Sequence, residues 1–193
     1  ATGTITQTSD SGTNDSANGY GNKSVYNAVD VSPTPARLAV LSNGNKTVSY
    51  AGGGGGYGSR IGTIAIPSSG KWGWTITMSS ASGAGDADLI GGGTGWKRYL
   101  YREAGTKHYD NSSASYGDAY VATDVLMIGV DVDSQTITFW NEGVSQGVAF
   151  SSVDFAAEGP FFPVTGMGTN TVATIDFDTP PAGYSVLSTE NLP

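Results

Sequence analysis

The chain has 193 residues, enough for one domain with a sizeable hydrophobic core. Its 17 acidic and 9 basic residues give a net charge of −8, which argues against nucleic acid and anionic membrane surfaces as partners, because both require clustered Lys and Arg. The sequence contains no cysteine, which excludes disulfides and thiolate chemistry, and no apolar run approaches the roughly 18 residues of a membrane-spanning helix.

The composition predicts an all-β fold. Glycine occurs 29 times, while the helix formers Glu and Lys occur only four and five times. No apolar segment of helical length repeats with a period of 3.6 residues between capping signals. Many short strands joined by turns are therefore expected, and no helix.

The first nineteen residues differ from the rest of the chain. They are almost wholly polar or small, a composition that predicts disorder for the isolated segment, yet threonines alternate from Thr2 to Thr8 as they do in a strand. We predict an arm over residues 1–19 that orders only against another chain, a globular domain over residues 20–184 and a tail over residues 185–193.

Strand signals follow along the domain. Leu38–Leu41 and Thr47–Tyr50 flank Asn43-Gly44, which predicts a hairpin. Trp72 to Met78 alternates large apolar residues with small or polar ones, the pattern of a half-buried strand. Further strands are expected near residues 61–66, 96–101 and 171–177, and glycine-rich loops at 52–58 and 91–95.

The most regular pattern lies between Gly117 and Phe150. Apolar residues alternate from Leu126 to Val132, and a polar turn precedes a second strand over Thr136–Trp140. After the turn at Asn141-Glu-Gly143, a third strand starts with Gly147–Phe150. Three strands joined by short polar turns predict an antiparallel meander. The predicted core residues are Trp74, Ile76, Leu126, Ile128, Val130 and Phe139.

This meander resembles the central signature of SPRY domains, in which an apolar run ends in Asp-x-Asp and is followed by an aromatic strand end, Asn-Gly and Ala-Phe. Two positions depart from the pattern, since Thr123 replaces a glycine and Glu142 separates Asn141 from Gly143. Ser69–Trp74 and Pro160–Val164 resemble the family's flanking strands. The resemblance extends over about residues 27–184 and implies a single antiparallel β-sandwich, concanavalin-like and of jelly-roll type, that binds rather than catalyses.

The C-terminal residues carry a second resemblance. The sequence Pro180-Pro-Ala-Gly-Tyr184, followed by Leu187, Thr189 and Asn191-Leu-Pro193, is similar to the end of SPRY-like segments in phage and environmental viral proteins. It implies a virion-surface structural or binding protein, such as a fibre, appendage or capsid decoration component, made in the host cytoplasm. The expected partners are other virion proteins, further copies of the chain in a homo-oligomer, and a host cell-surface glycan or protein.

Two other classes of protein stay open. A cellular SPRY adaptor would have the same fold and would bind proteins. A glycan depolymerase on a concanavalin-like sandwich would need paired carboxylates. Retaining members of that class place Glu-x-Asp-x-x-Glu on one strand, and this sequence lacks that pattern.

Catalytic motifs do not fit their context. Gly143–Gly147 matches Gly-x-Ser-x-Gly around Ser145, but predicted strands flank it, and the only histidine, His108, precedes it instead of following it. We therefore expect no enzymatic activity, no catalytic residue and no cofactor.

Three Asp-x-Asp pairs resemble calcium ligands. They are Asp86/Asp88, Asp131/Asp133 and Asp176/Asp178. Strand-end turns, in which Asp accepts hydrogen bonds from nearby backbone, explain such pairs without a metal. We expect no metal site, and the pair in a predicted glycine-rich loop, Asp86/Asp88, is the one for which calcium is hardest to reject.

The candidate ligand-binding residues lie after the second glycine loop, in the most basic and aromatic stretch of the chain. They are Trp96, Lys97, Arg98, Tyr99, Tyr101 and Arg102. Aromatic faces with nearby donors suit sugar rings or a loop of another protein. The competing interpretation, which we favour on general grounds, is that the two tyrosines pack against a sheet face and the cations lie in water.

Overall fold

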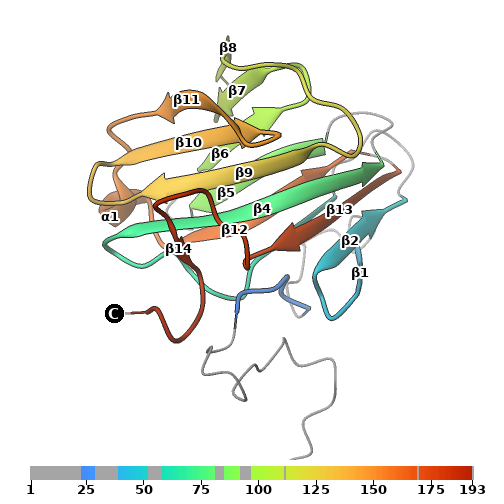
Figure 1. The fold of residues 1–193 in the computed structure, drawn as a ribbon, viewed down its shortest axis with the longest axis horizontal. Coiled ribbons are helices and arrows are strands. Elements are labelled where there is room, and N and C mark those ends of the chain that lie inside the picture. Colours follow the sequence, from blue (N-terminus) through green and yellow to red (C-terminus); the bar gives the residue numbers. More distant parts are fainter. Residues whose placement is uncertain are drawn as a thin grey trace, which may run out of the picture.

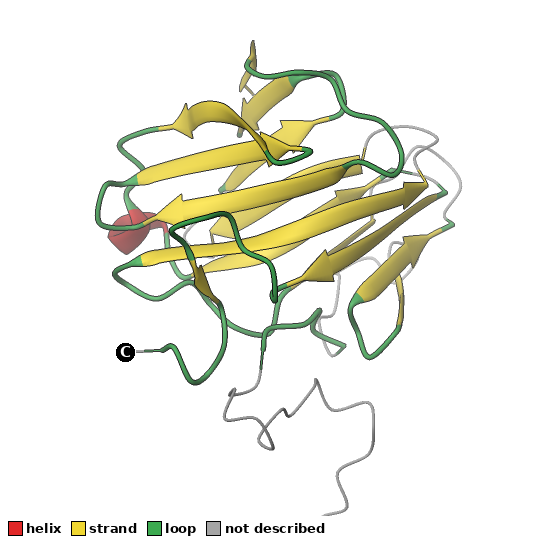
Figure 2. Ribbon diagram, viewed as in Figure 1, coloured by secondary structure: helices red, strands yellow, loops and turns green. Residues whose placement is uncertain are grey.

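The computed structural model describes residues 23–28, 39–51, 58–80, 85–91, 97–110, 112–168 and 170–192. Within these ranges the chain forms two sheets whose neighbouring strands are antiparallel except for one short parallel pair. Figure 1 shows the two sheets stacked face to face, and Figure 2 shows that strands make up nearly all of the regular structure. The predicted all-β sandwich is confirmed.

The larger sheet brings together strands from both ends of the described chain. Its order is β1 (Val40–Ser42), β2 (Thr47–Tyr50), β13 (Thr171–Asp176), β4 (Lys71–Ser80), β9 (Val125–Asp131), β10 (Thr136–Asn141) and β11 (Val144–Phe150), and β14 (Ser185–Val186) pairs in parallel with β4. The predicted hairpin and meander are both in this sheet. The closing strand β13 lies between β2 and β4.

The smaller sheet has the order β3 (Gly58–Ile61), β12 (Phe161–Met167), β5 (Gly85–Gly91), β6 (Arg98–Arg102), β7 (Thr106–Tyr109) and β8 (Ser112–Ser115). Asp86 and Asp88 are thus on β5, paired with β12 and β6, which corrects their placement in a loop. One helix was not expected: α1 (Phe155–Glu158), where the Asp154 side chain accepts a hydrogen bond from the Ala157 N–H.

The core lies between the sheets. Trp74 on β4, Ile128 on β9 and Phe139 on β10 are neighbours across three strands, and each has 0 % exposed surface. The other predicted core residues, Ile76, Leu126 and Val130, are also fully buried. The alternation in the sequence therefore identified the inward face correctly.

The outward face of β4 and β9 is covered as well. Gly73 and Gly129 are paired across these strands, and the missing side chains leave room for the segment that ends at Tyr184. A Cβ atom on Gly129 would lie 2.6 Å from the Tyr184 ring. Beyond this residue β14 joins the sheet and Leu187 is fully buried, so the segment expected as a tail belongs to the sandwich as far as Ser188.

The turns explain two sequence features. Glu142 and Gly143, which join β10 to β11, both have positive φ angles (49° and 77°), as a two-residue hairpin turn requires. The Asp131 side chain accepts a hydrogen bond from the Ser134 N–H at 3.0 Å. Turn chemistry is therefore the observed role of that aspartate.

Candidate binding site at the helical end of the sandwich

The predicted basic and aromatic patch is divided by strand β6. Trp96 lies outside the described residues. Lys97 forms an ion pair with Asp110 and lies 5.2 Å from the centre of the Tyr109 ring. Arg98 and Arg102 are half-buried.

Tyr99 and Tyr101 point into the sandwich and are 4 % and 0 % exposed. The Tyr101 ring packs against Tyr120 and Phe139, with ring centres 5.2 and 5.5 Å apart, and burial raises the pKa of its hydroxyl to about 12. These two rings are core residues and cannot serve as stacking faces on the surface, which corrects that part of the prediction. Ligand binding by the remaining residues stays a prediction.

The hydroxyl end of Tyr99 reaches a polar pocket of about 340 Å³. It donates to Glu158 Oε2 at 2.6 Å, and Tyr109 on the neighbouring strand donates to Oε1 at 3.0 Å. The pKa of the Tyr99 hydroxyl is raised far above its ordinary value, mainly by burial and to a smaller extent by the hydrogen bond to Glu158. The two tyrosines thus hold one carboxyl group at the pocket wall through two donated hydrogen bonds.

A lysine lines the same pocket. Lys107 on β7 donates to the Ala149 carbonyl of β11 at 2.5 Å, and its ammonium group lies 5.4 Å from the centre of the Phe150 ring, a cation–π distance. Lys107 therefore connects β7, the strand next to the edge of the smaller sheet, with β11 at the edge of the larger sheet.

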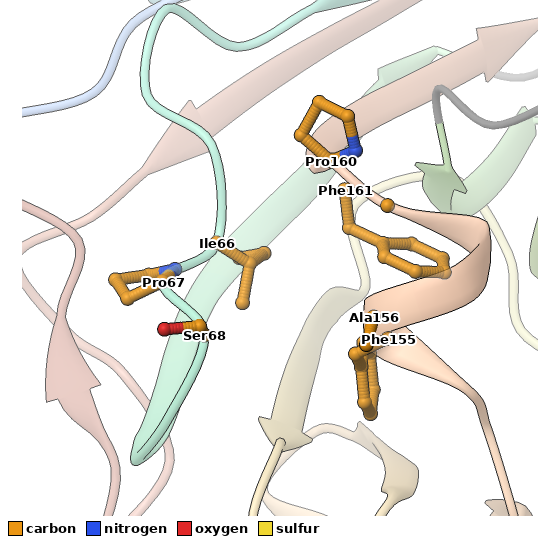
Figure 3. A pocket seen from close by; sticks show the side chains of 8 residues that line it. Ile66, Pro67, Ser68, Phe155, Ala156, Pro160 and Phe161 are labelled. Carbon is orange, nitrogen blue, oxygen red and sulfur yellow. The ribbon is translucent and has the colours of Figure 1, made fainter.

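On the other side of α1 lies an apolar pocket of about 410 Å³ (Figure 3). One wall is the segment from Ile66 to Ser68, fixed by the hydrogen bond from the Ile66 N–H to the Phe161 carbonyl at 2.8 Å. The other wall is Phe155, whose ring packs edge-on against Phe161 with centres 5.0 Å apart, together with Ala156 and Pro160. Ser68, Ala156 and Pro160 are exposed, so the pocket is open to solvent.

Sequence reasoning missed both pockets. The four-residue helix that separates them, with Phe155 and Ala156 facing one and Glu158 the other, is too short to produce a periodic pattern. The available signal was Asp154 three residues before Ala157, a helix N-cap arrangement.

Ser145 and His108 do not form a catalytic pair. Ser145 is exposed on β11, and its hydroxyl accepts a hydrogen bond from the Gly147 N–H at 3.2 Å. His108 Nε2 lies 2.9 Å from the Ser113 hydroxyl, and burial, with a smaller effect of Arg102, lowers its pKa. Each side chain thus has partners close to it in sequence, Gly147 for Ser145 and Ser113 for His108.

The two stacked antiparallel sheets define a β-sandwich domain. Residues 58–180 match the SPRY domain family, which is more than half of the chain, so the chain belongs to that family. One similar solved structure is the SPRY domain of human HERC1, with a TM-score of 0.58 and 18 % sequence identity, and the match covers 73 % of this chain and 94 % of that one. Another is a human SPRY domain, with a TM-score of 0.59 and 15 % sequence identity, and the match covers 73 % of this chain and 96 % of that one.

At these identities the two structures establish the fold alone. SPRY domains are protein-interaction modules and generally non-catalytic, which agrees with the coarse expectation of a binding protein. In the part of the chain that the structure describes, no helix has the length and apolar character needed to cross a membrane.

Proposed function

We propose that this chain is a non-catalytic module that binds a protein partner at the α1 end of its sandwich, on the surface of a virus particle. The observation that carries the binding function is the SPRY family match over residues 58–180, because that family is a protein-interaction fold. The viral setting is supported by the resemblance of the segment after Pro180 to viral proteins.

The chemistry of the α1 end specifies what the partner presents. The apolar pocket takes an apolar side chain, which provides the desolvated centre of an interface. Asp154 is exposed at the start of α1, and the chain has a net charge of −8. Both favour a positively charged residue of the partner next to the apolar side chain that enters the pocket. The expected partner segment therefore carries an apolar residue next to Lys or Arg.

A cellular adaptor function fits the same fold. Mass spectrometry of purified virus particles separates the two settings, since a virion protein is present in fixed stoichiometry and an adaptor is absent. A glycan-turnover assay addresses the depolymerase alternative. Glu142 accepts a hydrogen bond from the Val125 N–H at 2.5 Å, and Glu158 accepts from two tyrosines, so both carboxylates have structural contacts.

The contact surface can be tested because the chain has no cysteine. A single cysteine at Ala156 or at the exposed control position Ala182 is labelled with a photo-crosslinker and mixed with disrupted particles. The label at residue 156 should capture one predominant protein that the label at residue 182 does not capture.

The captured protein is then purified and titrated against three forms of the domain. Ala156→Glu places a charge at the apolar pocket and should weaken binding at least about tenfold, while Ala182→Glu should leave the affinity unchanged. Equal capture by both labels, or full affinity of Ala156→Glu, would show that the partner binds elsewhere.

A further inference from the structure

The two sheets have four edges, and most of them are protected against pairing with another chain. Beside β3, the Asn27 N–H donates to the Ile61 carbonyl at 2.7 Å and the Thr63 N–H to the Val25 carbonyl at 2.8 Å. The edge strand β1 has only three residues. At the far edge of the larger sheet, β11 has two register shifts against β10, and such bulges disrupt an edge.

The fourth edge, β8, has none of these protections except its short length. Its residues are Ser112, Ser113, Ala114 and Ser115, all exposed and uncharged, without proline. It pairs with β7 in an unbroken register. An edge strand of this kind presents unpaired N–H and C=O groups that can accept another strand.

The pairing pattern shows which residues present those groups. The Tyr116 N–H donates to the Gly105 carbonyl at 3.0 Å, so residues 105 and 116 are a hydrogen-bonded pair. Hydrogen-bonded and non-bonded pairs alternate along an antiparallel ladder, and therefore Ala114 is directed at β7. Ser113 and Ser115 direct their backbone groups outward, where no described residue forms a backbone hydrogen bond with them.

This edge is complementary to itself. We infer that β8 pairs antiparallel with β8 of a second copy of this chain, about a two-fold axis through Ala114. Ser113 of one copy is then opposite Ser115 of the other on both sides of the axis, and all of the outward groups of these residues are paired. The two Ala114 residues face each other as a non-bonded pair, whose small side chains and lack of charge permit close approach.

A second observation favours this side of the sandwich. Val144 and Val148 on β11 are 63 % and 55 % exposed, and a second chain on this side would remove their apolar surface from water. Two hydrogen bonds place β11 beside the segment that follows β8: Tyr116 donates from its hydroxyl to the Gly147 carbonyl at 2.5 Å, and the Asp118 N–H donates to Gln146 Oε1 at 2.7 Å. A partner on β8 therefore approaches these valines.

The geometry can be tested with Ala114→Cys. Cα atoms of a non-bonded antiparallel pair are about 4.5 Å apart, within the range of a disulfide, and there is no other cysteine to interfere. Mild oxidation should convert this variant into a covalent dimer at low protein concentration. The matched control Ala182→Cys should stay monomeric under the same conditions.

Variants with opposite charges at residue 114, tested alone and mixed, show whether a lost dimer reflects lost strand pairing or lost folding. Ala114→Lys and Ala114→Glu should each raise the dimer dissociation constant at least about tenfold, because like charges face each other across the axis, and mixing the two variants should restore a dimer. For the unmodified chain, salt should strengthen the dimer, since each copy carries a charge of −8.

Sedimentation of the unmodified full chain gives the decisive comparison. A monomer at every concentration, or Ala114→Lys and Ala114→Glu variants that dimerise as well as the unmodified chain, would overturn the inference. Partner binding at the α1 end, measured with Ala156→Glu as above, is independent of this result.

Discussion

At the scale of single residues, the alternation in β9 identifies the positions where substitutions should lower the free energy of unfolding most. Leu126 and Ile128 have no exposed surface, and shortening either leaves a cavity as well as losing buried apolar area. We expect Leu126→Ala and Ile128→Ala to lower the free energy of unfolding by roughly 2–5 kcal/mol each. Urea denaturation measures this difference.

The control for these variants is Val144→Ala, at a position that is 63 % exposed. It should change the free energy of unfolding by less than about 0.5 kcal/mol. If Leu126→Ala and Ile128→Ala lower the free energy of unfolding as little as Val144→Ala does, the inward face of β9 has been misassigned.

A second residue-scale prediction concerns acid. Burial alone would raise the pKa of Asp131, but the hydrogen bond from Lys71, at 2.9 Å, and those from Ser134 hold it below its ordinary value. A lowered pKa in the folded state means that the stabilisation is present above the ordinary Asp pKa and is lost as the pH falls through the folded value.

The unmodified chain should therefore be more stable than Lys71→Met near neutral pH, and the difference should shrink below about pH 4. Melting temperatures of the two proteins across this pH range test it. A difference that stays constant from neutral pH down to about pH 2.5 would assign the effect of Lys71 to packing alone.

At the scale of elements, the sequence predicted those strands whose two faces differ. β4, β9 and β10 were found because large and small residues alternate in them. The same reasoning could not decide which side of β6 faces inward, since Tyr99 and Tyr101 alternate with Arg98, Leu100 and Arg102, and Leu100 is also buried. Alternation therefore identifies the inward face only where one side of a strand is clearly more apolar than the other, as in β4, β9 and β10.

The C-terminal cover of the larger sheet was missed for a related reason. In the sequence, Gly73 and Gly129 fall on the side of their strands that is expected to face solvent. In the structure they contact the segment that contains Pro181 and Tyr184, which leaves no room for a larger residue. A Cβ on Gly73 would be 2.6 Å from Pro181 Cδ and 3.0 Å from the Ile128 carbonyl oxygen. The contact is invisible in local sequence because its two sides are more than 50 residues apart.

These contacts predict different effects at the two glycines. Gly129→Ala meets the tip of the Tyr184 ring, a side chain that can move, whereas Gly73→Ala meets a proline ring and backbone, which cannot move easily. Gly73→Ala should be the more destabilising change, in the range of roughly 1–3 kcal/mol for overpacking.

A double-mutant cycle tests this explanation. Adding Tyr184→Ala should relieve the strain of Gly129→Ala, so that the two changes together cost less than their sum, and should relieve little in Gly73→Ala. If Tyr184→Ala changes the destabilisation caused by Gly73→Ala and by Gly129→Ala equally, the Tyr184 ring is not the group that an alanine at residue 129 contacts.

At the scale of the whole molecule, strand order and pocket location depend on long-range pairing. β13 lies between β2 and β4 although more than 90 residues separate it from each. The polar pocket likewise combines β6, β7, the end of β11 and α1. Local periodicity does not encode such contacts. The family resemblance predicted the sandwich, and the only sequence signal near the pockets that we identify is the N-cap pattern at Asp154.

The last prediction concerns the arm over residues 1–19, which lies outside the described residues and stays a prediction from sequence. Among the described residues, the first that belongs to the sandwich core is Val25, and we therefore expect deletion of residues 1–15 to leave the melting temperature almost unchanged. If the arm pairs as a strand with another chain of the particle, the deletion should abolish incorporation into the particle. Backbone hydrogen bonds would supply the affinity, and Ile5→Pro, which removes one donor, should therefore reduce incorporation more than Ile5→Ala. Quantifying both variants in purified particles tests this directly, and normal incorporation of the truncated chain would show that the arm has no role in assembly.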